Sequence, residues 1–262
     1  MTNEKTQPPI NRIAIVSVLL VSAFVAVLNQ TLLNTALPNI METLNVTAST
    51  SQWLMTGFML VNGVMIPVTA FLIGKFTTRR LFFTAMSLFT IGTVVAAAAP
   101  NFSLLLVGRL IQASGAGIMM PLMQTVMLMI FPIEKRGTVM GMAGLVIAFG
   151  PAIGPTLSGY LVEQYSWRVP FMVIIPIAIA AMIYGAFALK NVTEQTNPNI
   201  DILSIILSTL GFGGLLYGLS SAGNDGWDSA NVYIAIIVGA VSLITFILRQ
   251  FRLEKPILEF RV

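Results

Sequence analysis

The sequence contains eight long apolar segments, which constrain its fold more than any other feature. Each is close to the roughly 20 residues that an α-helix needs to cross about 30 Å of hydrocarbon. The segments are continuously apolar, whereas the strands of a membrane barrel alternate apolar and polar residues. We therefore predict an all-α membrane protein with about eight transmembrane helices. The predicted spans are 13–36, 51–73, 81–99, 104–130, 138–161, 169–189, 202–220 and 232–251.

Composition agrees with a membrane protein and removes several kinds of chemistry. The 262 residues are 56% hydrophobic and only 9% charged, whereas a globular domain carries about 25% charged residues. Cysteine and histidine are both missing from the sequence, so it offers no disulfide, thiol nucleophile or histidine proton shuttle. No nucleophile–base pair or phosphate-binding loop is evident, and we expect neither an enzyme nor a cofactor or metal. The partners expected are the lipid bilayer and a small molecule, not nucleic acid.

Basic residues are distributed unevenly between the two ends of the spans. With a cytoplasmic amino terminus, 12 of the 14 Lys and Arg residues fall in cytoplasmic segments, while Arg168 lies outside and Arg109 lies within a span. The positive-inside rule favours this orientation in the cell membrane. Trp53, Trp167 and Trp227 then fall at the outer ends, which is typical of an interfacial aromatic belt.

The polar segment between the sixth and seventh spans indicates a domain boundary. We predict a cytoplasmic tail over 1–12, a six-helix bundle over 13–190 and a cytoplasmic linker over 191–201. Two additional transmembrane helices over 202–251 and a cytoplasmic tail over 252–262 follow. The tail mixes charged and apolar residues without a clear stop, so we expect the natural chain to continue into a C-terminal half.

Arg109 and Gln112 are polar residues inside the fourth span. An arginine at the centre of a bilayer costs about 2.5–3.5 kcal/mol, so it normally faces protein or a water-filled cavity. We predict that Arg109 contacts substrate or modulates a proton site; the alternative is that it extends to the outer surface. Met120 and Met123 follow in the same span. Their flexible side chains suit varied apolar ligands, or ordinary helix packing.

The first span carries amides at Asn29, Gln30 and Asn34. Polar side chains in an apolar helix need partners or water, so all three are candidate substrate or coupling residues. Gln30 and Asn34 are four residues apart and share a helix face, whereas Asn29 and Asn34 do not. The alternative is that Asn29 and Asn34 form hydrogen bonds between helices.

Small residues recur every four positions in the fifth span, at Gly150, Gly154 and Ser158. Such a row lets another helix backbone approach closely. Pro151 and Pro155 lie beside it, and each would cost about 3 kcal/mol in a water-soluble helix. In a bilayer, neighbouring helices can satisfy the freed carbonyl groups. We therefore predict a bent membrane helix packed tightly against a neighbour.

Several motifs together resemble the 14-span drug:proton antiporters of the major facilitator superfamily, and most closely the lincomycin-resistance-type multidrug permeases. Residues 150–155 resemble the antiporter motif Gly-x-x-x-Gly-Pro-x-x-Gly-Gly, with Val146 and Pro155 in place of two glycines. Residues 109–117 resemble the fourth-helix motif, in which Arg and Gln precede a glycine pair. Residues 28–38 resemble Leu-Asp-x-Thr-x-x-Asn-x-Ala-Leu-Pro, with Asn29 at the acidic position.

The loop after the second span resembles the superfamily motif Gly-x-Leu-x-Asp-Arg-x-Gly-Arg-Lys more loosely. Lys75, Arg79 and Arg80 match basic positions, whereas Gly74 replaces the acid and Thr77 replaces a glycine. The resemblance implies a cytoplasmic gate loop. The alternative is that these charges only set the topology.

The resemblance implies export of lipophilic drugs by proton-coupled alternating access, at a site between two six-helix bundles. This chain supplies one bundle, so the implied partner is a missing C-terminal half or a second copy. None of the ten acidic residues lies deep in a predicted span. Proton coupling must then use a boundary acid such as Glu163 or Asp201, or a carboxylate in the missing half. Otherwise the protein does not couple to protons. Two alternatives stay open: a carrier for another small metabolite, and a truncated membrane remnant or subunit that transports nothing.

Overall fold

The computed structural model describes residues 11–193, 195 and 201–253, apart from the side chains of residues 224 and 225. Most of the predicted tails and of the linker therefore lies outside the described residues. The described part contains eight helices, each long and apolar enough to cross a membrane. They are α1 (Arg12–Leu44), α2 (Ala48–Lys75), α3 (Thr78–Ala98), α4 (Phe102–Ile130), α5 (Ile133–Gln164), α6 (Val169–Ala188), α7 (Ile202–Asp225) and α8 (Ala230–Arg252).

Short polar residues fix where several helices begin. The side-chain oxygens of Thr47, Thr77 and Asn101 each accept a hydrogen bond from the backbone N–H three residues later. These contacts satisfy N–H groups that have no partner within the helix. The predicted start of α5 was five residues late, because its first turn is polar and follows Pro132.

The first helix is longer than predicted and continues through Pro38 to Leu44. A proline normally marks a helix boundary because it lacks an N–H donor. In this long apolar helix the chain continues beyond it and ends at Asn45, whose φ of 51° is left-handed. Asparagine tolerates this conformation, and the backbone N–H of Asn45 donates to the carbonyl of Met41.

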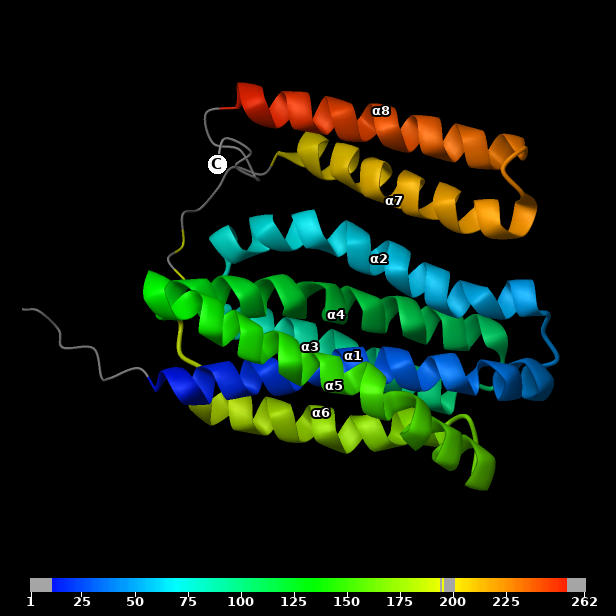
Figure 1. The fold of residues 1–262 in the computed structure, drawn as a ribbon, viewed down its shortest axis with the longest axis horizontal. Coiled ribbons are helices and arrows are strands. Elements are labelled where there is room, and N and C mark those ends of the chain that lie inside the picture. The colour runs from blue at the N-terminus through cyan, green and yellow to red at the C-terminus, as the bar shows by residue number, and fades with distance from the viewer. Residues whose placement is uncertain (1–10, 194, 196–200, 254–262) are drawn as a thin grey trace, which may run out of the picture.

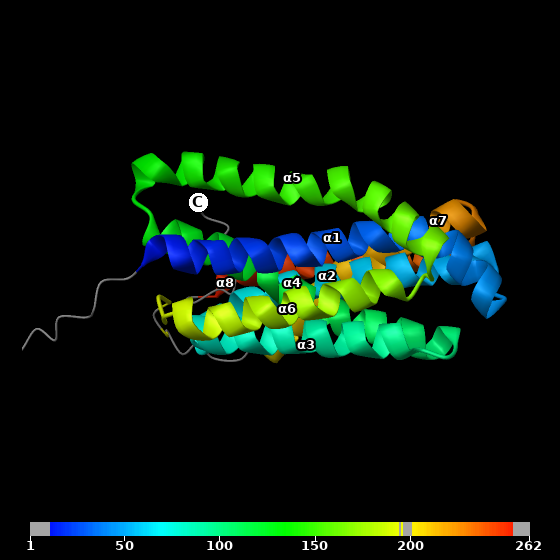
Figure 2. The same ribbon diagram turned by 90° about the horizontal axis from the view of Figure 1, so that it is seen from below.

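Helices α1 to α6 form a bundle, and α7 and α8 lie beyond α2, on the side away from α6 (Figure 1). Helix α7 packs on α2, and α8 packs on α7. The second of these contacts is close because Gly214 and Gly239 let the two backbones meet. Helix α5 runs along α1 at the edge of the bundle, away from α3 (Figure 2).

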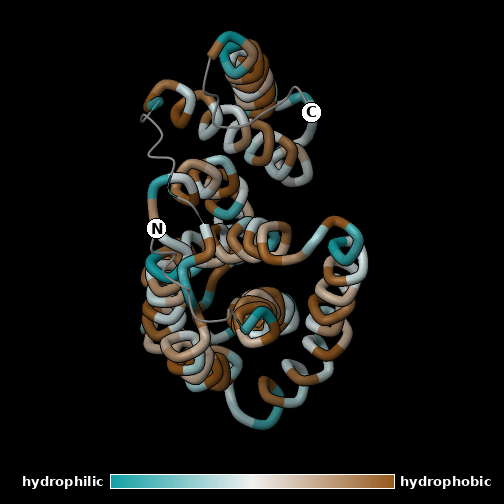
Figure 3. Tube along the Cα trace, turned by 90° about the vertical axis from the view of Figure 1, so that its left-hand side faces the viewer, coloured by the Kyte–Doolittle hydropathy of each residue, from teal (hydrophilic) through white to brown (hydrophobic). Residues whose placement is uncertain are grey.

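Successive helices run in opposite directions, which gathers the basic residues at one end of the molecule. This end holds Lys75, Arg79, Arg136 and Arg249, and we call it the basic end. Viewed from there, hydrophobic residues cover most of the helix length and hydrophilic residues concentrate at helix ends and connections (Figure 3). This distribution is the one expected of a multi-pass membrane protein.

Two apolar clusters form the interior, and the smaller one corrects the prediction for Trp167. This tryptophan is fully buried, with its ring edge-on to Phe171 at 6.4 Å between centroids. The Arg168 guanidinium covers it at 4.2 Å and donates a hydrogen bond to the Ala99 carbonyl. Trp167 is therefore a core residue instead of a member of an interfacial belt. Trp53 and Trp227 are exposed.

Candidate functional site

Arg109 lies fully buried at the centre of a polar cluster that joins four helices. Its Nη1 atom donates to Asn29 Oδ1 on α1 at 2.9 Å and to Gln112 Oε1 on α4. Gln112 Nε2 in turn donates to Thr93 Oγ1 on α3 at 2.7 Å. The guanidinium carbon lies 4.2 Å from the ring centroid of Phe58 on α2, in cation–π geometry.

The positive charge of Arg109 has only neutral neighbours in the described part of the chain. The two side chains that accept its hydrogen bonds are amides, and the only ion pair among described residues joins Arg249 to Asp201. The Arg109 Nε and Nη2 atoms are buried and have no hydrogen-bond partner among the described residues. A buried unpaired charge costs far more than a buried ion pair. This arrangement is therefore one that stability alone does not favour.

The cluster depends on close contact between α3 and α4, and glycines permit that contact. A side chain at Gly115 would collide with the Ala85 carbonyl oxygen and with the Phe89 backbone nitrogen. Gly92 likewise lies against the backbone of Gln112. The glycine that follows the Arg–Gln pair in the sequence thus brings Gln112 within reach of Thr93.

A cavity of about 330 Å³ lies beside this cluster, between α1, α2 and α4. Its volume is within the range of small-molecule sites, which is about 300–1,000 Å³. Apolar side chains and three amides line it, with no charged residue among them. The lining residues are Ala26, Val27, Gln30, Phe58, Asn62, Ile66, Ala116, Met120, Pro121 and Gln124.

The three amides, Gln30, Asn62 and Gln124, come from three different helices. Within the residues that the structure describes, none of their side chains has a hydrogen-bond partner. An amide in an apolar span without a partner is costly, so each is expected to bond to water or to a ligand in the cavity. Their convergence on one cavity is the strongest indication of a binding site in this molecule.

Phe58 connects the cavity to the arginine cluster, because its ring both lines the cavity and lies against the Arg109 guanidinium. Phe58 and Asn62 were not selected from the sequence, although Asn62 is an amide inside an apolar span and could have been. Phe58 gave no such signal, since an aromatic residue in a membrane helix is ordinary. Gln124 is a similar polar residue among the methionines of the fourth span, and it was not predicted as a site residue.

The predicted site residues divide between the cluster, the cavity and other places. Asn29 and Gln112 join Arg109, while Gln30 and Met120 line the cavity. Met123 is buried in the apolar core, and Asn34, although exposed, does not line the cavity.

The small residues of α5 face α1, whereas Pro151 and Pro155 face away and are exposed. A side chain at Gly154 would collide with Thr31, whose hydroxyl donates to the Gly150 carbonyl at 3.3 Å. Ser158 Oγ donates to the Leu32 carbonyl at 2.6 Å. The antiporter-like run is therefore the contact between α5 and α1, as predicted for a small-residue row.

The predicted gate loop carries three cations that each lie over a phenylalanine ring. Lys75 is near Phe76, Arg79 near Phe83 and Arg80 near Phe76, with distances to the centroids between 4.9 and 5.9 Å. The backbone N–H of Arg79 also donates to Asn191 Oδ1. The role of this loop as a gate stays a prediction.

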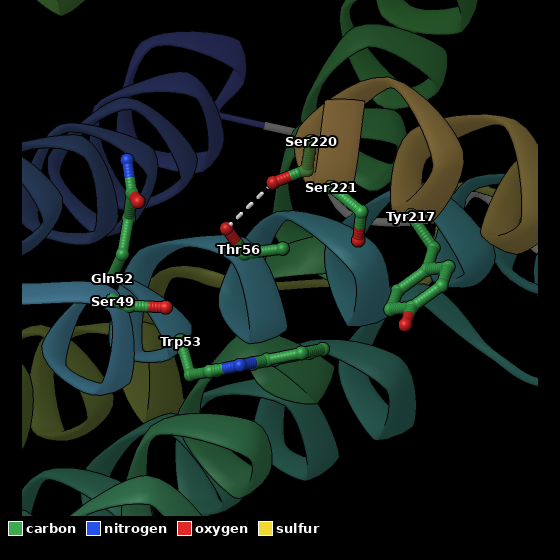
Figure 4. A pocket seen from close by; sticks show the side chains of 7 residues that line it. All are labelled: Ser49, Gln52, Trp53, Thr56, Tyr217, Ser220 and Ser221. Atoms are coloured by element: carbon green, nitrogen blue, oxygen red, sulfur yellow. Dashed lines mark hydrogen bonds between the residues drawn. The ribbon is translucent and has the colours of Figure 1, made fainter. Parts of the chain in front are cut away.

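A second, smaller hollow lies where α2 meets α7, at the end opposite the basic end (Figure 4). Its volume of about 60 Å³ is that of about two water molecules, too small for a drug-sized molecule. Thr56 and Ser220 share a hydrogen bond of 2.9 Å across it, and the rings of Trp53 and Tyr217 lie 5.9 Å apart. We interpret it as a polar contact that holds α7 on α2.

Comparisons with known proteins agree with this architecture. Residues 19–258 match the model of the Major Facilitator Superfamily. The uncharacterized MFS-type transporter YcnB of Bacillus subtilis (strain 168) is 62% identical over 262 residues, which are 100% of this chain and 56% of YcnB. The lincomycin resistance protein LmrB of the same strain is 45% identical over 245 residues, 93% of this chain and 51% of LmrB.

A solved structure gives the same fold. The crystal structure of the peptide transporter POT in complex with sulfate matches 92% of this chain and 53% of its own, with a TM-score of 0.68 and 15% identity. That identity supports the fold alone. The chain spans about half the length of the curated relatives it matches.

Proposed function

Because this chain belongs to the Major Facilitator Superfamily, we propose that it supplies one half of a multidrug efflux transporter that exports lipophilic molecules by proton-coupled alternating access. The chain is thus a transporter protein and not an enzyme. The names of several relatives, including lincomycin and multidrug resistance proteins, support the substrate class. Multi-pass insertion with the basic end in the cytoplasm of the cell follows from the positive-inside rule.

The cavity between α1, α2 and α4 carries this proposal. Apolar walls with a few amides fit lipophilic molecules that have scattered hydrogen-bonding groups, because the amides can donate or accept. Met120 adds a side chain that adapts to different shapes. In this family of folds the binding site lies near the middle of the membrane, between two helical bundles. A second half, or a second copy of this chain, would form the facing wall.

Proton coupling requires a group that gains or loses charge as access alternates. Within the described helices no carboxylate reaches Arg109, and Asp201 is bound to Arg249. We propose that the coupling carboxylate comes from outside this chain and acts on the unpartnered Nε and Nη2 atoms of Arg109. Glu163, exposed at the end of α5, is the alternative within the chain.

Dye efflux from energised cells tests the proposal. We expect Arg109→Ala to abolish efflux through the natural transporter while the protein still inserts, since the polar cluster beside the cavity loses its buried cation. Arg12→Ala removes an exposed arginine at the start of α1 and serves as the matched control, with efflux retained. A protonophore should stop the efflux of the unchanged protein.

Expression of these 262 residues alone separates the remaining possibilities. Protonophore-sensitive efflux would mean that copies of this chain assemble into a working carrier, and Glu163 should then be changed. Insertion without efflux would mean that a second half is required. If the natural transporter carrying Arg109→Ala exports dye at the normal rate, the proposed role of Arg109 is wrong.

A further inference from the structure

A groove between α7 and α8 combines apolar walls with two arginines at the basic end. Its volume is about 320 Å³. Leucines from both helices form its walls, including Leu203 and Leu207 on α7 and Leu248 on α8, while Arg249 and Arg252 lie at its charged end. It is separate from the amide-lined cavity, whose lining residues lie on α1, α2 and α4.

The two arginines differ in how they are bound. Arg249 makes two hydrogen bonds to the Asp201 carboxylate, from Nε at 3.0 Å and from Nη2 at 3.1 Å. Its charge is therefore compensated. Arg252 is exposed, and among the described residues no carboxylate lies within ion-pair distance of it. Counted over the described residues, Arg249, Arg252 and Asp201 thus leave one positive charge where the apolar walls of the groove end.

The surroundings of Arg252 distinguish it from other cations at the basic end. Lys75, Arg79 and Arg80 lie over phenylalanine rings, and Arg136 donates to the Phe131 carbonyl. Arg252 instead borders an open groove in which two leucines are about half exposed, Leu203 at 49% and Leu248 at 57%. In a membrane, lipid chains cover such leucines.

We propose that this groove is a binding site for an anionic phospholipid. One acyl chain lies along the leucines of α7 and α8, and the phosphate accepts hydrogen bonds from the Arg252 guanidinium. The apolar length next to a cation that has no carboxylate partner among the described residues matches the two parts of such a lipid. A soluble anion or a neutral lipid would match only one of these parts. The Asp201–Arg249 pair holds the two helix ends together, and thus fixes the width of the groove.

Quenching of an inserted tryptophan by brominated lipids tests this proposal on the purified protein in vesicles. In a chain whose Trp53, Trp167 and Trp227 are replaced by phenylalanine, Leu248→Trp places the only tryptophan in the groove. Phe187→Trp places a control reporter on α6, also near the basic end, at a residue that is 84% exposed and outside the groove. Mixtures of brominated phosphatidylglycerol and phosphatidylcholine give the relative binding of the two lipids at each position.

One basic residue near a membrane surface contributes about 1 kcal/mol, which corresponds to about a fivefold preference. We therefore expect phosphatidylglycerol to bind about fivefold better than phosphatidylcholine at the groove reporter, and about equally at the control. Arg252→Gln should remove the preference, whereas Arg136→Gln, an equal loss of charge on α5, should leave it.

Three outcomes would overturn the proposal. The first is an equal lipid preference at both reporters. The second is a groove preference that persists in Arg252→Gln. The third is a groove reporter that neither lipid quenches while the control is quenched, because protein would then cover the groove.

Discussion

Arg109 and Arg249 are two arginines of one chain in opposite circumstances. Within the part of the chain that the structure describes, Arg109 is fully buried among four helices, donates only to neutral amides and has two nitrogen atoms without a partner. Arg249 lies in the last turn of α8, with 36% of its side chain exposed, and binds the Asp201 carboxylate with two hydrogen bonds. The exposed arginine has the counter-ion that the buried one lacks.

The contrast indicates that Arg249 has a structural role and Arg109 a functional one. A cation near water can be paired at little cost and holds α7 to α8, so Arg249 is explained by structure. A lone cation in the bundle interior costs stability, and replacing buried ionic groups by apolar residues is often neutral or stabilising. Arg109 is therefore better explained by the transport function than by folding.

The largest effects on stability and on efflux are expected for Arg109→Met. Methionine fills a similar volume without a charge, so we expect thermal stability in detergent to be kept or raised, by up to about 3 kcal/mol, while efflux is lost. Unfolding followed by intrinsic fluorescence measures this. A loss of stability greater than about 1 kcal/mol would mean that Arg109 holds the bundle together, and the comparison would fail.

Asn29→Asp supplies Arg109 with the carboxylate that Arg249 already has. The new carboxylate oxygen would lie where Asn29 Oδ1 now accepts from Nη1 at 2.9 Å. We expect the free energy of unfolding to rise by about 1–2 kcal/mol at neutral pH, because the charge-assisted hydrogen bond is partly offset by the desolvation of the new carboxylate. Asn34→Asp, at an exposed position on the same helix, is the control and should give no gain. Equal effects of the two changes would argue against an unsatisfied charge on Arg109.

Arg249→Met is expected to lower the stability of the protein, whereas Arg109→Met is expected to keep or raise it. It leaves Asp201 without its cation, but the pair is partly exposed, so we expect only a small loss of stability. The same fluorescence measurement serves, with Arg252→Met as a neighbouring control that breaks no described ion pair. Stabilisation by Arg249→Met would remove the distinction between the two arginines.

The smallest expected effect is a pH dependence that arises from Asp201. Burial acts to raise the pKa of its carboxyl, but hydrogen bonds from Arg249 and Ser204 outweigh burial, and the pKa lies below its ordinary value. A lowered pKa in the folded state stabilises the protein above the ordinary carboxyl pKa of about 3.9, and the contribution disappears as pH falls through the lowered value.

The free energy of unfolding, measured by thermal unfolding, should therefore differ between the unchanged protein and Asp201→Asn by a constant amount from pH 7 to pH 5. Below about pH 4 the difference should shrink, by less than about 1 kcal/mol in all. A difference that stays constant to pH 2 would mean that the Asp201 carboxylate contributes no pH-dependent stability.

Much of this architecture follows from the sequence alone. Eight helices, their alternating direction and the gathering of basic residues at one end follow from the length of each apolar run and from the position of each charge. These are local properties, because every backbone group inside a bilayer must be satisfied within its own helix. The row Gly150, Gly154 and Ser158 also predicted a close helix contact, since close approach depends on small side chains whichever helix is the partner.

Tertiary structure alone decided which side chains meet. The sequence did not reveal that Asn29 on α1 would accept a hydrogen bond from Arg109 on α4, or that Phe58 would lie between the Arg109 cluster and a cavity. Nor did it reveal that three amides, Gln30, Asn62 and Gln124, would line the same cavity. Each of these contacts depends on the rotation of a helix about its axis and on its neighbours, and an apolar run that is hydrophobic on all sides does not specify its rotation. Trp167 is a further case, since a tryptophan near a helix end suits a lipid interface equally well until Arg168 and Phe171 are seen to cover it.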